Sequence, residues 1–128
     1  MPTLFGLGVG PGDPELITLK ALRVLREVPV ILAPKSRREG ESLALEIVAR
    51  VLGPEMARKE TVELHFPMTR DPGRLGAAWR EAAETAAGYL RRGRDVAFVT
   101  LGDPTFYSTF FLLREEVARL APEAAVVT

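Results

Sequence analysis

The sequence contains no cysteine, asparagine or glutamine and a single histidine, His65. Without cysteine the chain has neither a disulfide framework nor a thiol nucleophile. One histidine without cysteine cannot supply a His/Cys metal cluster. We therefore expect no protein-bound metal and a fold that is stabilised by its hydrophobic core.

Net charge and long apolar runs are also missing. The 17 basic residues balance the 17 acidic ones, whereas nucleic-acid-binding proteins show a basic excess or a clustered basic stripe. No apolar stretch approaches the roughly 20 residues of a membrane span, and the N-terminus leads into a predicted strand without a basic leader. We expect a cytoplasmic protein that binds neither nucleic acid nor membranes.

The order of apolar segments predicts the fold class. The 128 residues, 47% of them hydrophobic, suffice for one globular domain. Apolar residues at helical spacing lie between the short apolar stretches. This alternation predicts an α/β fold with a five-stranded, mainly parallel sheet and helices on both faces. The predicted strands are 3–8, 29–33, 61–66, 96–101 and 124–127.

The stretch from Leu101 to Thr109 (LGDPTFYST) is the most informative one. It follows an unbroken apolar run, which is typical of a parallel strand buried on both faces. Ligands of open α/β sheets bind at the carboxyl ends of such strands. Gly102 allows a ligand to approach the backbone, and Asp103 offers a carboxylate. Asp103-Pro104 is equally typical of a helix start, so this turn alone leaves both interpretations open.

A second Gly-Asp-Pro turn lies at residues 12–14, after the first predicted strand. The two turns would border one crevice if strands 3–8 and 96–101 are neighbours. The glycines of residues 8–12 do not form a dinucleotide fingerprint, because Asp13 stands where the third glycine belongs. The chain also has no P-loop and no G-x-S-x-G elbow for His65 to serve, and we interpret His65 as a strand-end residue.

Together these turns resemble the two signatures of the tetrapyrrole methylases, which use S-adenosylmethionine. Residues 8–21 are similar to the first signature and residues 101–109 to the second. Further blocks resemble the branch that methylates C20 of precorrin-2 in cobalamin biosynthesis: residues 34–36, 65–71 and 107–109. Members of the family have two α/β domains, so the resemblance implies that residues 1–128 are the N-terminal domain of a two-domain protein, truncated in the fifth strand.

The resemblance also implies a reaction and a cofactor site. A methyl group would pass from the sulfonium of S-adenosylmethionine to C20 of precorrin-2 or cobalt-precorrin-2. Pro11 would contribute to the cofactor pocket, and Gly102, Asp103 and Phe106 would line it from the second turn. Because the donor is already activated, alignment is most of what the protein must supply. No catalytic base is assigned, and a homodimer is expected.

The substrate carries many carboxylates, which favours cations at the mouth of the cleft. Cations in loops are also ordinary solubilising residues, and that interpretation stays open. Tyr107 and Ser108 follow the second turn, but water would accept the meso proton equally well. The candidate substrate-binding residues are Lys35, Arg37, Arg38, Arg70, Tyr107 and Ser108.

Two alternatives remain for the function. One is another tetrapyrrole methylase, such as uroporphyrinogen III C-methyltransferase. The other is a non-catalytic flavodoxin-like module that binds a small ligand. The products formed from a few tetrapyrrole substrates test the first alternative. The gene downstream of Thr128 tests the second, since an in-frame second α/β segment would favour the enzyme.

The missing Asn and Gln, together with arginine as the main basic residue, favour a thermophilic source. A GC-rich genome would produce much of the same bias. We predict a thermal unfolding midpoint above about 60 °C, since mesophile domains unfold at about 45–65 °C. A lower midpoint in a calorimetric scan would argue for the genomic explanation.

Overall fold

The computed structural model describes residues 2–9, 15, 17–35, 43–65, 71–100 and 108–127, without the side chains of Leu75 and residues 108–112. Its strands form one sheet in the order β3-β2-β4-β1-β5, and all four pairings are parallel. The α/β class and the five-stranded sheet are therefore confirmed. The strands are β1 (Thr3–Gly8), β2 (Val30–Lys35), β3 (Glu60–His65), β4 (Val96–Thr100) and β5 (Ala125–Val127).

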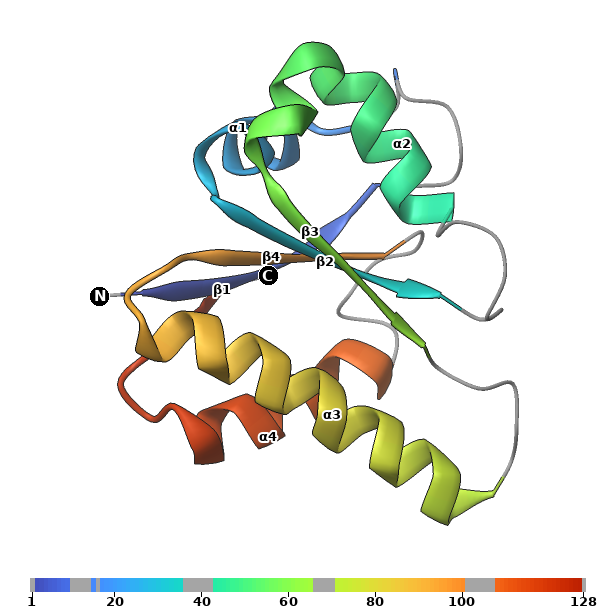
Figure 1. Cartoon of the computed structure of the whole chain (residues 1–128), viewed down its shortest axis with the longest axis vertical. Helices are drawn as coiled ribbons and strands as arrows, with labels where there is room; N and C mark the ends of the chain where they lie inside the picture. The colour runs from blue at the N-terminus through green and yellow to red at the C-terminus, as the bar shows by residue number, and fades with distance from the viewer. Residues whose placement is uncertain are drawn as a thin grey trace.

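Helices cover both faces of this sheet (Figure 1). α1 (Leu19–Glu27) and α2 (Leu43–Leu52) pack on one face, and α3 (Pro72–Arg91) and α4 (Ser108–Leu120) pack on the other. A 3-10 helix, η2 (Gly53–Arg58), connects α2 to β3 and was not predicted. None of the helices in the described ranges is long and apolar enough to cross a membrane.

Each central strand contributes to two separate cores. On β4, Val96 and Phe98 face α3 and α4, whereas Ala97 and Val99 face α1 and α2. Successive side chains of a strand point to opposite faces, and both faces are covered here. This is why β4 is an unbroken apolar run in the sequence.

The connections predict that ligands bind at the carboxyl end of β4. This strand lies between β1 and β2, which are followed by α1 and α2 on one face, whereas β4 itself is followed by α4 on the other. Neighbouring strands whose helices leave to opposite faces form the topological switch point at which α/β sheets bind ligands. In Figure 1 the carboxyl ends of β1 to β4 all lie on the right and fan out.

The structure identifies the N-terminal cap of α1 and corrects the end of one predicted strand. Thr18 caps α1, since its hydroxyl accepts a hydrogen bond from the Ala21 amide at 3.1 Å. The strand predicted at 29–33 continues through Pro34 to Lys35, because β2 goes on pairing with β3 up to Lys35–His65. Lys35 is therefore the last residue of a strand, and its predicted place in a loop was wrong.

The inner face of α3 consists of alanines that allow the helix to pack closely on the sheet. Ala82, Ala83, Ala86 and Ala87 are fully buried in the core that includes Phe98. A larger side chain at these positions must displace the helix or its neighbours, because protein cores are packed as densely as organic crystals.

We therefore predict that Ala86→Leu lowers the free energy of unfolding by about 1–3 kcal/mol. Urea denaturation followed by circular dichroism measures this change. Ala77→Leu is the matched control, because Ala77 is exposed on the same helix and should change stability by less than about 0.5 kcal/mol. Equal effects at the two positions would contradict the close packing of α3.

Candidate functional site at the carboxyl edge of the sheet

The carboxyl ends of β1 and β4 are joined side by side. Their parallel register extends to the pair Gly8–Thr100, and the Val9 amide donates a hydrogen bond to the Thr100 carbonyl at 2.8 Å. The two Gly-Asp-Pro turns follow these strand ends in the sequence. The sequence predicted a shared crevice only if the first and fourth strands are neighbours. That condition is confirmed.

Most of the predicted site residues belong to segments outside the described ranges. Ser108 is the first residue of α4, and only its place in the helix is described. Lys35 is the one candidate whose side chain the structure places. The assignments outside the described residues stay predictions: Pro11, Arg37, Arg38, Arg70, Gly102, Asp103, Phe106 and Tyr107.

Lys35 belongs to a polar cluster at the carboxyl edge of β2 and β3. Its Nζ lies 3.7 Å from Oε2 of Glu63, and both side chains are partly buried. His65 is opposite Lys35 in the register and is exposed at the last position of β3, which agrees with its interpretation as a strand-end residue. Sequence reasoning missed Glu63. The signal available was its two-residue spacing from His65, which places both on one face of a strand.

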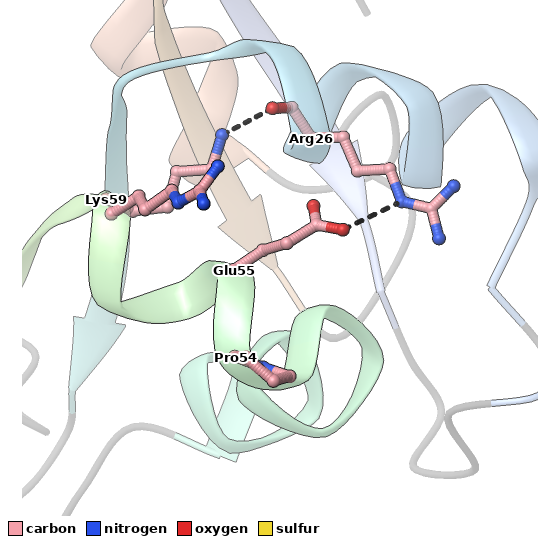
Figure 2. A pocket seen from close by; sticks show the side chains of 5 residues that line it. Arg26, Pro54, Glu55 and Lys59 are labelled. Atoms are coloured by element: carbon pink, nitrogen blue, oxygen red, sulfur yellow. Dashed lines mark hydrogen bonds and ion pairs between the residues drawn. The ribbon is translucent and has the colours of Figure 1, made fainter.

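The opposite, amino edge of the sheet carries a hollow lined by five residues: Arg26, Pro54, Glu55, Arg58 and Lys59 (Figure 2). There Lys59 Nζ donates hydrogen bonds to the carbonyls of Arg26 and Val28, at 2.6 and 2.7 Å. Glu55 Oε1 lies 3.9 Å from Nε of Arg26. An ammonium group at the last carbonyls of a helix stabilises its C-terminus. The hollow is therefore explained by the anchoring of α1 to η2 and β3.

Burial lowers the pKa of the Lys59 ammonium, and the nearby Glu55 carboxylate raises it in part. The two short hydrogen bonds to carbonyls need the donor protons of this ammonium, which supports a structural role.

Within the described residues, no group of three histidine, aspartate or glutamate side chains lies close enough to hold a metal ion.

Comparison with known proteins decides the family. Residues 3–128 match the family described as Tetrapyrrole (Corrin/Porphyrin) Methylases. The chain belongs to this family. The match includes both Gly-Asp-Pro turns and all five strands, so the β1–β4 edge described above is a feature of a tetrapyrrole methylase domain.

Two curated relatives are similar over most of this tetrapyrrole methylase chain. It is 39% identical to the cobalt-precorrin-2 C(20)-methyltransferase of Salmonella typhimurium over 89% of its length and 47% of the relative's. It is 43% identical to the probable cobalt-precorrin-2 C(20)-methyltransferase of Methanocaldococcus jannaschii over 84% of its length and 44% of the relative's. The chain thus spans about half the length of the curated relatives it matches.

A solved structure gives the same fold. The uroporphyrin-III-C-methyltransferase of Thermus thermophilus superposes with a TM-score of 0.66 at 25% identity, covering 98% of this chain and 46% of that one. The sequence is thus closer to the two C(20)-methyltransferases than to this structural neighbour.

We predict that Lys59→Met lowers the free energy of unfolding by about 1–2 kcal/mol, because the α1 carbonyls at the amino edge lose their charged donor. Affinity for S-adenosylmethionine should not change. Arg58→Met is the control, since Arg58 is exposed beside the same hollow. Denaturation and calorimetric titration measure the two effects. Weaker ligand binding by stable Lys59→Met protein would instead identify the hollow as a binding site.

Proposed function

We propose that this chain is the N-terminal domain of an S-adenosylmethionine-dependent C-methyltransferase that acts at C20 of precorrin-2 or cobalt-precorrin-2. The observation that supports the proposal is the pairing of β1 with β4 up to Gly8–Thr100, continued by the Val9–Thr100 hydrogen bond. This pairing brings together the strand ends that lead into the two turns of the family signature. The names of the relatives supply the substrate and the methylated carbon.

S-adenosylmethionine supplies a methyl group that its sulfonium already activates. Pro11, Gly102, Asp103 and Phe106 would hold this donor at the carboxyl edge. Their task is to align the methyl carbon with the ring carbon and to exclude water. Reacting atoms held about 3–3.5 Å apart in line gain about 7–11 kcal/mol relative to the same reaction in free solution. A site of glycines and backbone amides can therefore suffice without a pair of acid and base residues.

The complete cofactor site would need a second α/β domain. The chain spans less than half of each of the two relatives compared above, and the proposal places the donor in a cleft between two domains. We further propose a homodimer located in the cytoplasm. These assignments, like the thermophilic source, stay predictions that follow from the family and the composition.

One alternative has a specific observation in its favour. Uroporphyrinogen III C-methylation is supported by the structural neighbour from Thermus thermophilus. Its 25% identity is well below the 39% and 43% of the C(20)-methyltransferases. We therefore favour the C20 reaction. A non-catalytic binding module agrees less well with membership of a methylase family.

The decisive experiment is product identification with full-length protein and S-adenosylmethionine. Precorrin-2, cobalt-precorrin-2 and uroporphyrinogen III are supplied in parallel, and mass spectrometry and NMR locate the new methyl group. We expect methylation at C20 of one or both precorrin-2 forms. Parallel titrations of S-adenosylmethionine into residues 1–128 and into the full-length protein show whether this domain binds the donor alone. Methylation of uroporphyrinogen III only would establish the alternative.

The proposed role of Asp103 can be separated from helix capping. We predict that Asp103→Ala in the full-length protein weakens S-adenosylmethionine binding about tenfold, since hydrogen bonds to a charged group contribute about 1.5–3 kcal/mol. Asp71→Ala is a matched control: Asp71 also precedes a proline and caps α3 through the Gly73 amide at 3.0 Å. It should lower stability by about 1 kcal/mol and leave affinity unchanged. Unchanged affinity of Asp103→Ala in calorimetry would remove Asp103 from the site.

A further inference from the structure

Lys35 and Glu63 form a loose ion pair. The distance from Nζ to Oε2, 3.7 Å, is longer than a hydrogen bond. The same oxygen is buried and has no hydrogen-bond partner among the residues that the structure describes. A buried carboxylate oxygen without a donor is unfavourable. The two groups are therefore held by charge attraction, and a lysine ammonium group has three N–H donors with which to bind a better-placed acceptor.

The pair lies on the face of the sheet that α1 and α2 cover. Ile31 and Ala33 of β2 pack in the core under α1 and α2. Because side chains alternate along a strand, Lys35 lies on that same face. α1, the first α-helix after β1, packs on this same face.

Lys35 also lies level with the predicted cofactor site along the strands. β2 and β4 pair as far as Leu32–Phe98. Counted onward from that pair, Lys35 is one residue further along than Thr100, the last residue of β4. Pairing of β2 with β4 has ended by then, whereas pairing with β3 continues to Lys35–His65. Pro34, which has no N–H for the sheet, lies between these two points. Lys35 therefore lies beyond the point at which β2 and β4 stop pairing.

We propose that Lys35 binds a carboxylate of the ligand and that Glu63 is the internal carboxylate which this ligand displaces. The proposal rests on the proposed function, since both ligands of that reaction carry the required group. The acidic side chains of the tetrapyrrole are one source and the methionine carboxylate of S-adenosylmethionine is the other. The side chains of Lys35 and Glu63 are only partly buried, with exposures of 20% and 27%. Glu63 is on the edge strand β3, so it can turn to water once displaced.

Displacement of Glu63 by the ligand predicts whether each mutation tightens or weakens ligand binding. Glu63→Gln removes the competitor and should tighten ligand binding about two- to fivefold, the range that the free energies of partly exposed ion pairs imply. Lys35→Met removes the cation and should weaken binding about tenfold. In the Lys35→Met background, Glu63→Gln should have no further effect, because the two groups act on each other. If Glu63 instead only stabilised the strand pair, its loss would weaken binding or leave it unchanged.

The test uses full-length protein and two probes, S-adenosylmethionine by calorimetry and uroporphyrin III, a stable polycarboxylate tetrapyrrole, by fluorescence quenching. The proteins are the wild type, the two single variants and the double variant. Glu60→Gln is the matched control: Glu60 is at the amino end of the same strand, with Arg94 at 2.9 Å, and its loss changes the net charge equally. The control should leave both affinities unchanged.

The probe that responds identifies which carboxylate Lys35 binds. The gain in Glu63→Gln should shrink as salt rises, since partly exposed charges are screened. A Glu63→Gln protein that binds neither probe more tightly, or a gain that persists in the Lys35→Met background, overturns the proposal. Methyl transfer by the wild type is assayed separately. Its failure would count against the C20 reaction, whereas the binding series would still report on Lys35 and Glu63.

Discussion

The hydrogen-bonded pairing of β1 with β4 is the constraint on which the carboxyl edge depends. These strands are far apart in the sequence, yet their register runs from Leu4–Val96 to Gly8–Thr100. A slip of one residue would exchange the two faces of a strand and bury the wrong side chains. Leu4 and Leu7 belong to different cores, so the register is specified from both faces. The positions of the strand ends, and of the turns that follow them, are set by this packing.

Burial of the central strands on both faces confines the polar groups to the sheet's two edges. At the amino edge they stabilise the fold: Lys59 caps α1, Arg94 pairs with Glu60, and Asp95 accepts a hydrogen bond from the Thr3 amide at 2.8 Å. At the carboxyl edge the Lys35–Glu63 pair, at 3.7 Å, leaves a buried carboxylate oxygen without a hydrogen bond among the described residues. This unsatisfied oxygen agrees with ligand binding at the carboxyl edge.

Part of the candidate site could be predicted because its signals are local. Asp71-Pro72 has the residue types that typically begin a helix, and Asp71 does cap α3, since the cap needs only the next few residues. The extent of β2 could not be predicted in this way. Proline usually ends a strand, but here pairing with β3 carries the strand past Pro34 to Lys35. Glu63 was missed for the same reason, because its pairing with Lys35 depends on contact between two strands and not on nearby residues in the sequence.

The sequence by itself determined the kinds of element, their order and the two signature turns, because apolar periodicity and turn chemistry depend on near neighbours. It also carried the resemblance to the tetrapyrrole methylases. Only the tertiary structure decided that β4 lies between β1 and β2, that Val9 and Thr100 are joined, and that Lys35 lies beside Glu63. The reason is physical: strand neighbours and their register follow from long-range hydrogen bonding and from how two cores pack together, which no local pattern encodes.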